Sequence, residues 1–212
     1  MAPMACPICE KRKPKRFCPA KDARICPRCC GEHREVTIAC PLDCRYLRDS
    51  RERDYAGGID PKDFPYKEIE IDAAFLREHA ELVETCGRAV FEGTLAVPGA
   101  VDADTREALE GLIRTCKTRE SGLYYDSRPA SVYAGSIFDH LRQTLENFLR
   151  EEQQQTGFAR SHDAAIMKTW VFLVRMALDR DNGRPKGRAY LDFLKLHFEQ
   201  AKQAEAAVVL PG

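Results

Sequence analysis

Eight of the ten cysteines of this 212-residue chain lie in one N-terminal segment, and their spacing is that of metal ligands. Two C-P-x-C steps begin at Cys6 and Cys26, and a C-P-x-x-C step begins at Cys40. Two thiolates separated by two residues can converge on one ion, and proline after the first cysteine favours the tight turn that this needs. Such clustering is typical of a metal site and not of a disulfide framework. The candidate ligands are Cys6, Cys9, Cys18, Cys26, Cys29, Cys30, Cys40 and Cys44.

Tetrahedral sites made only of thiolates suit zinc, with an iron–sulfur cluster as the alternative. Eight thiolates fill two four-coordinate sites, and sites closed in this way are structural. We therefore predict two Zn²⁺ ions. The adjacent Cys29 and Cys30 project in different directions, which favours a partition in which they bind different metals. A sequential partition stays open, and His33 could replace Cys29 or Cys30. The preferred partition is Cys6, Cys9, Cys26 and Cys29 around one ion, and Cys18, Cys30, Cys40 and Cys44 around the other; the sequential one starts with Cys6, Cys9, Cys18 and Cys26.

Charge is distributed unevenly along the chain. Residues 1–53 contain 13 Lys and Arg against 7 Asp and Glu, whereas the other 159 residues contain 20 against 26. A basic segment of this kind is compatible with nucleic-acid binding. Part of the excess is expected to neutralise the metal–thiolate sites, because four thiolates outweigh the charge of one Zn²⁺ ion. The candidates for contact with an anion or a nucleic acid are Lys11, Arg12, Lys13, Lys15 and Arg16, with Arg184, Lys186 and Arg188 from a later loop.

The cysteine pattern resembles the cross-braced two-zinc fingers of the HIT, MYND and B-box families. These families share an opening C-x2-C, a central cysteine pair and closing Cys or His ligands, and the resemblance covers Cys6–Cys44, about a fifth of the chain. It implies a small two-zinc module that serves as a platform for protein partners. The chain departs from the pattern at Cys18, which has no second cysteine two or three residues later, and in its all-cysteine closing ligands. The whole chain also resembles a bacterial family with a cysteine-rich N-terminus and a helical body, which implies no function.

The elements that follow the cysteines are predicted to be helical. A short helix completes the module near Tyr55, and the Gly57-Gly58 pair with Pro61 and Pro65 marks a linker. Apolar residues then recur at helical spacing over about 67–92, 102–121, 130–155, 161–182 and 187–206. The fold class is therefore mainly α. We predict a two-zinc cysteine-rich module at 1–56, a linker at 57–66 and an all-α bundle of about five helices at 67–212.

Several functional classes find no support in the sequence. No apolar run reaches the ~18–20 residues of a membrane-spanning helix, and the N-terminus has no apolar core of a signal peptide. We therefore expect a cytoplasmic protein with no membrane partner. Motifs of zinc proteases, α/β-hydrolases and P-loop enzymes are missing. His79 and Cys86 are about 10 Å apart on one predicted helix, which is too far for a catalytic His–Cys pair.

The sequence thus predicts a non-enzymatic, zinc-binding interaction or scaffold protein whose partner is a protein. The alternative is a nucleic-acid-binding regulatory protein that uses the basic run of the module. Two further segments are interpreted as structural: the loop 180–188 as a turn between helices, and the pair Tyr124-Tyr125 as one ring that packs in the bundle beside one surface ring.

Overall fold

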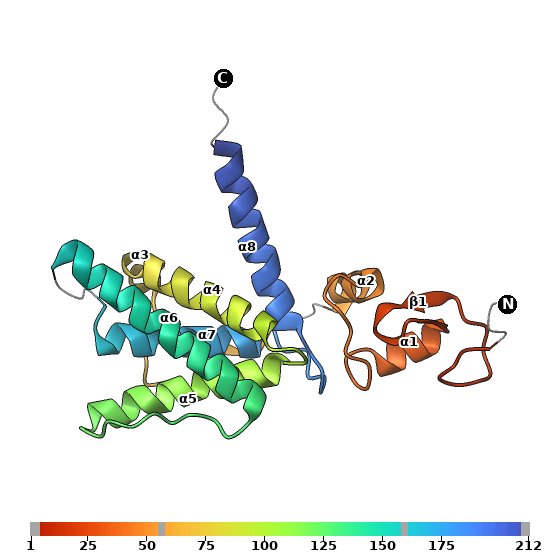
Figure 1. Cartoon of the computed structure of the whole chain (residues 1–212), viewed down its shortest axis with the longest axis horizontal. Helices are drawn as coiled ribbons and strands as arrows, with labels where there is room; N and C mark the ends of the chain where they lie inside the picture. The colour runs from red at the N-terminus through yellow and green to blue at the C-terminus, as the bar shows by residue number, and fades with distance from the viewer. Residues whose placement is uncertain (1–4, 55–57, 158–160, 209–212) are drawn as a thin grey trace. The chain divides into compact units, whose positions relative to one another are not determined.

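The chain is mainly helical in a computed structural model that describes residues 5–54, 58–157 and 161–208 (Figure 1). Helices account for 62% of the residues, which confirms the predicted fold class, and the described residues contain one small two-stranded sheet. They form two compact units. The first consists of the segment up to Gly57 together with Asp181–Ala189, and the second of Gly58–Arg180 together with the chain from Tyr190 onward. None of the described helices has the length and apolarity needed to span a membrane.

The first unit begins with a hairpin that the sequence analysis did not predict. Strand β1 (Arg16–Cys18) pairs antiparallel with β2 (Ala23–Ile25), and a 3₁₀ turn at Pro19–Lys21 connects them. The turn closes at Asp22, whose φ of 45° is left-handed. Strands of three residues are too short to show the alternation by which a strand is recognised in a sequence.

Two helices complete the first unit. Helix α1 (Pro27–His33) begins directly after β2, and Pro27 occupies its first turn, where a missing N–H does no harm. Helix α2 (Arg45–Asp54) follows the last pair of cysteines and corresponds to the short helix expected there. The buried core of this unit is composed mostly of sulfur: Cys6, Cys18, Cys26, Cys29, Cys40 and Cys44, with Ile25, Ile38 and Leu47.

The second unit is a bundle in which α7 (Asp163–Asp179) is the central helix. It packs against α5 (Asp102–Glu120) and α4 (Ala80–Ala96). Trp170, Val171 and Val174 of α7 are almost fully buried, as expected for a helix that is apolar on most of its circumference. Helix α6 (Val132–Thr156) lies against α4 and α5 (Figure 1).

The first helix predicted for the bundle, over 67–92, is two helices in the structure. Helix α3 (Ala73–Glu78) begins at its N-cap Asp72, whose carboxylate accepts the Phe75 N–H at 2.7 Å, and it ends at His79, where α4 begins. The residues before α3 do not form an α-helix, and Arg175 of α7 binds three of their carbonyl oxygens. Its guanidinium donates to the oxygens of Pro65 (3.3 Å), Tyr66 (2.7 Å) and Ile69 (3.0 Å).

The last helix, α8 (Ala189–Val208), begins at a buried carboxylate from another helix. Asp102 is 2% exposed, and it accepts the N–H groups of Tyr190 (2.9 Å) and Leu191 (3.2 Å). A carboxylate at a helix N-terminus satisfies free amides and interacts favourably with the helix dipole. Within α5 itself, the N-cap is Val101, and Asp104 in the first turn accepts the Val101 N–H at 2.9 Å.

Candidate metal centre

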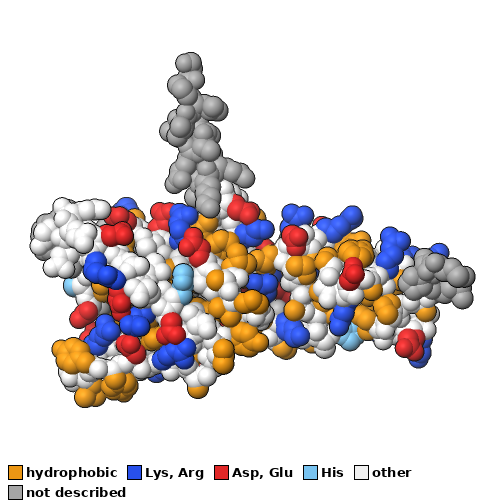
Figure 2. Space-filling model, viewed as in Figure 1, with side chains coloured by type: hydrophobic (Ala, Val, Ile, Leu, Met, Phe, Trp, Pro, Cys, Tyr) orange, Lys and Arg blue, Asp and Glu red, His pale blue; other side chains and the backbone are white. Residues whose placement is uncertain are grey.

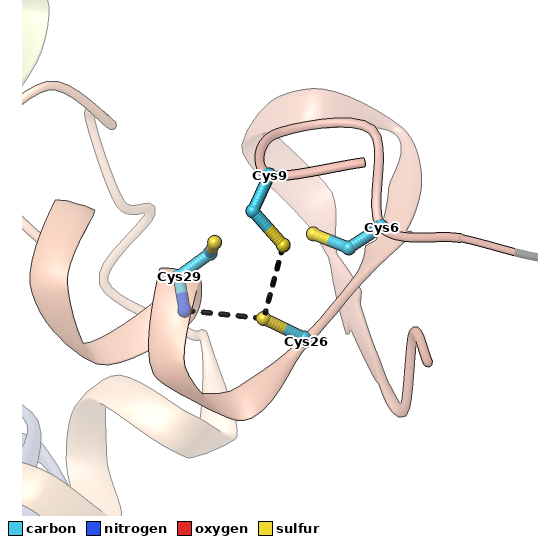
Figure 3. A group of neighbouring side chains, drawn as sticks. All are labelled: Cys6, Cys9, Cys26 and Cys29. Atoms are coloured by element: carbon cyan, nitrogen blue, oxygen red, sulfur yellow. Dashed lines mark hydrogen bonds between the residues drawn. The ribbon is translucent and has the colours of Figure 1, made fainter. Parts of the chain in front are cut away.

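Four cysteines from two separate segments converge at one point of the first unit (Figure 3). Cys6 and Cys9 belong to the N-terminal loop, which turns at Glu10 with a φ of 53° and a hydrogen bond from the Glu10 N–H to the Cys6 oxygen. Cys26 is the N-cap of α1, and Cys29 lies in the first turn of that helix. The structure thus brings together the two C-P-x-C steps, which is the first of the two groupings that we preferred from the sequence.

The geometry of this group is that of a four-coordinate site. The four sulfur atoms all lie within 4.8 Å of one another, and Cys9 Sγ is 3.9 Å from Cys26 Sγ. A tetrahedron with metal–sulfur bonds of ~2.3 Å has edges of about 3.8 Å. Cys6, Cys26 and Cys29 are buried, and Cys9 is half-buried. The group can therefore hold a metal ion and shield most of it from water.

Backbone amides and one arginine favour negative charge on these sulfurs. Hydrogen bonds from the backbone at Lys11 and Arg12 lower the pKa of Cys9 to about 6. Burial has the opposite effect on Cys29 and raises its pKa to about 12. The pKa of the Arg12 guanidinium is itself raised, first by a hydrogen bond with Cys26 and then by the nearby thiolates. One residue of the basic run is therefore a partner of the sulfur cluster.

The other four cysteines lie near one another without forming a comparable group. Cys18, Cys40 and Cys44 are buried and Cys30 is half-buried, all in the same small core. Burial raises the pKa of Cys18, and the charges of Cys30 and Cys44 raise it further. Among the described residues, however, these sulfurs do not converge within 4.8 Å as the first four do. Arg16 Nη1 donates to Cys30 Sγ at 3.7 Å, so a second arginine of the basic run also contacts a thiol.

His33 lies at the edge of the first group. Its ring, the Glu32 carboxylate and Cys29 Sγ come within 4.8 Å of one another, and Cys29 therefore belongs to both arrangements. His33 Nδ1 is also 2.8 Å from Thr37 Oγ1, which fixes the ring orientation. The tetrathiol group is complete without His33, so the histidine is a neighbour of that group in this geometry.

The loop of Arg184, Lys186 and Arg188 packs on the cysteine-rich segment and belongs to the first unit. Arg184 Nη1 donates to the Arg34 oxygen at 2.7 Å, and Lys186 Nζ donates to the Thr37 oxygen at 3.2 Å. The sequence analysis treated this loop as a turn between two helices of the bundle. Its basic side chains instead bind carbonyl groups of the module, which limits their use in binding an external anion.

Glu35 is the centre of this contact, and the sequence analysis did not single it out. It is 1% exposed and has a left-handed φ of 52°. Its carboxylate accepts Arg51 Nη2 at 2.7 Å, Asn182 Nδ2 at 2.8 Å and the Arg188 N–H at 3.0 Å. Its backbone oxygen accepts the Lys186 N–H at 2.8 Å. Nothing in the periodicity of the sequence marks this glutamate, because all its partners except Arg51 lie about 150 residues away.

The tyrosines and histidines of the second unit do not assemble a comparable site. Tyr124 is 85% exposed and Tyr125 is 57% exposed, so the prediction that one of them packs in the bundle is wrong. Leu123 is exposed too, so three consecutive exposed apolar side chains follow α5. His79 instead contacts the Phe75 ring, at a centroid distance of 4.8 Å.

The two cysteines of the second unit are expected to resist alkylation in the native protein. Burial raises the pKa of Cys116 from 9.0 to about 11 and also raises the pKa of the buried Cys86. Because the thiolate is the nucleophile, Cys116 should react at neutral pH about a hundredfold more slowly than an ordinary thiol. Mass spectrometry of iodoacetamide-treated protein measures this rate, which should rise as the pH approaches 11. Rapid native-state labelling of Cys116 at pH 7 would contradict the assignment, and labelling in guanidinium is the control.

No family model, curated protein or solved structure matches this chain in the comparisons with known proteins. The four converging cysteines are therefore the feature of the chain that bears most directly on its function.

Proposed function

We propose that the chain is a zinc-binding interaction protein without enzymatic activity, in which the metal stabilises the first unit. The observation that carries this proposal is the convergence of Cys6, Cys9, Cys26 and Cys29 within 4.8 Å. Four thiolates close the coordination sphere of a tetrahedral ion and leave no position for water or substrate. A closed site of this kind stabilises a fold and does not activate a substrate.

The sulfur spacing favours a single ion. The 3.9 Å between Cys9 Sγ and Cys26 Sγ matches ligands that share one atom of zinc. An iron–sulfur cluster holds its cysteine sulfurs farther apart, because several iron and sulfide atoms lie between them. A single iron with four thiolates has similar geometry but absorbs visible light, so colour separates the two metals.

The composition of the core supports a structural role for the ion. In the described part of the unit, the buried aliphatic side chains beside the six buried cysteines are those of Ile25, Ile38, Leu42 and Leu47. So few apolar groups stabilise a unit of this size poorly, and small domains of this kind commonly depend on metals or disulfides. Bound metal supplies folding free energy directly, since the assembled site does not exist in the unfolded chain.

We propose that Cys18, Cys30, Cys40 and Cys44 hold a second zinc ion. Their burial in one core and the mutual influence of their charges support this assignment. Arg16 at Cys30 would balance the negative charge of that site, as Arg12 does at the first. The second site requires the four sulfurs to draw closer than they lie in the structure.

The proposal is tested by measuring the metal content of the purified full-length protein with elemental analysis and an absorption spectrum. We expect about two zinc ions per chain and no visible chromophore. One zinc per chain would support the tetrathiol site and contradict the second one. Iron with visible absorption would overturn the structural-zinc proposal, and a stably folded first unit without any metal would overturn it as well.

A further inference from the structure

The first unit is strongly basic once the loop Asp181–Ala189 is included. It contains 16 Lys and Arg against 9 Asp and Glu, a formal charge of +7, whereas the second unit contains 17 against 24, a formal charge of −7. A zinc ion with four thiolates contributes a charge of −2 per site, so even two such sites leave the unit positive. Lys and Arg side chains are spread over the visible face of this unit in Figure 2. A basic unit joined to an acidic one points to a local anionic ligand.

Several of these cations already have partners inside the unit. Arg12 and Arg16 contact cysteines. Arg51 pairs with the buried Glu35, and Arg184 and Lys186 bind backbone oxygens. The residues that can bind an external anion are therefore to be sought among exposed side chains with no such contact.

The hairpin carries a group of such residues around an exposed aromatic ring. Phe17 of β1 lies opposite Arg24 of β2, and both side chains are exposed on the outward face, while Cys18 and Ile25 point into the core. Lys15 lies two residues before Phe17, on the same side of an extended chain.

Lys13 and Lys21 flank the hairpin and are exposed as well. Among the described residues, none of these four cations lies within ion-pair distance of a carboxylate, and Asp22 in the turn is the one acidic residue of the hairpin. Phe17 is 49% exposed, and the only other exposed large apolar side chain in the described part of the first unit is Val36.

We propose that this face of the hairpin binds single-stranded nucleic acid, with Phe17 stacking on a base and Lys13, Lys15, Lys21 and Arg24 binding phosphates. An exposed ring between cations matches the alternation of bases and phosphates along a single strand. A paired base could not reach the ring, because its faces are covered by its neighbours in the duplex. An acidic peptide would use the cations but would not need the ring. This inference rests on the proposed function, since the hairpin contains Cys18, directly precedes Cys26, and needs the metal-bound fold.

The test is the anisotropy of fluorescent 12-nucleotide oligo(U) RNA and oligo(dT) DNA, titrated with zinc-loaded full-length protein. We expect binding at low salt, with the logarithm of the affinity falling by about 3 per decade of salt if four phosphates are contacted. Phe17→Ala should weaken binding about tenfold, as expected for the loss of one stacked base. Arg24→Glu should weaken binding and reduce the salt dependence.

Matched variants separate a hairpin site from general charge. Arg48→Glu changes the charge of the same unit by the same amount at an exposed position on α2, and Val36→Ala removes the other exposed apolar side chain. Each of these two variants should bind at least one of the two oligonucleotides with the affinity of the wild type. Equal losses for Arg48→Glu and Arg24→Glu, or no effect of Phe17→Ala, would overturn the hairpin site. Preferential binding of a poly-glutamate peptide would overturn it in favour of a protein partner.

Metal content and resistance to protease are measured on every variant. A protein that keeps its zinc and its folded first unit but binds neither oligonucleotide would overturn the nucleic-acid inference and leave the zinc proposal intact. A protein without zinc, or with an unfolded first unit, would overturn the zinc proposal instead. Stronger binding of RNA than of DNA would support the site and identify the 2′-hydroxyl as a further contact.

Discussion

Cys26→Ser is expected to abolish metal binding at the tetrathiol site and to unfold the first unit, while the second unit stays folded. Cys26 belongs to the second ligand segment and contacts the first. Its Sγ is 3.9 Å from Cys9 Sγ and accepts the Cys29 N–H. Serine is a good N-cap, so the substitution preserves a cap for α1 and removes the thiolate specifically. Structural zinc contributes roughly 10–16 kcal/mol in small zinc-binding peptides. A whole domain is stable by only about 5–15 kcal/mol, so the first unit should not survive the loss.

The expected result is read out by limited proteolysis, because circular dichroism alone would change little. Helices α1 and α2 contain 7 and 10 residues, whereas α4 to α7 contain between 17 and 25 residues each. Trypsin should cut the Lys11–Arg16 run rapidly in the variant and leave the core of the second unit intact. Full protection of the first unit together with unchanged metal content would contradict the role of Cys26.

Two serine substitutions at other cysteines serve as controls. Cys116→Ser lies in the second unit and should leave the metal content unchanged. Cys30→Ser tests the second group of cysteines, and it should remove one ion of two if that group holds zinc. Loss of all metal in Cys30→Ser would show that the two groups bind their ions as one cooperative unit.

The grouping of Cys6, Cys9, Cys26 and Cys29 was accessible from the sequence for a physical reason. In each C-P-x-C step, proline and the two-residue gap fix both sulfurs locally, so each pair is nearly formed before the chain folds. Only one long-range question remains, which is whether the two pairs meet. Cys18 has no such local partner, and spacing alone could not place it.

The helices of the second unit were predictable because their apolar residues repeat over several turns. The non-helical start of the predicted 67–92 segment was not predictable, since its carbonyl groups are bound by Arg175, about a hundred residues later in the chain. The hairpin was missed for a different reason: with three residues per strand, Phe17 and Arg24 show no periodicity. The prediction nevertheless identified the basic run beside it by composition alone.

The docking of Asp181–Ala189 on the module exceeds what any local pattern can reveal. Asn182-Gly183 is an ordinary turn sequence, and the three cations after it suggest an anion site. In the structure the side chains of Arg184 and Lys186 donate to backbone oxygens of the module. The buried carboxylate of Glu35 accepts Asn182 Nδ2 and the Arg188 backbone N–H. From the sequence alone, a single glutamate among other charged residues is expected to be exposed, because its distant partners are not known.

Glu35→Ala is expected to destabilise the first unit by about 3–5 kcal/mol, because it removes a buried carboxylate that pairs with the half-buried Arg51 and accepts two further hydrogen bonds. The side chains of Arg51 and Glu35 are 16% and 2% exposed, so solvent replaces little of the lost interaction. Asn182 Nδ2 and the Arg188 N–H lose their acceptor as well. Alanine and glutamate are similarly strained at the φ of 52°, so the backbone contributes little to the difference.

Hydrogen exchange measured by mass spectrometry locates the effect. The amides of Lys186 and Arg188, which bind Glu35 in the wild type, should exchange much faster in Glu35→Ala, and Glu35→Gln should lie between the two because it keeps one acceptor. Glu32→Ala is the matched control, since its ion pair with Arg28 is exposed and contributes at most about 1 kcal/mol. Unchanged exchange in 181–189 for Glu35→Ala would mean that the loop is held by Arg184 and Lys186 alone. Fast exchange with unchanged metal content would instead show that the carboxylate fastens the loop to a module that the zinc already holds in its fold.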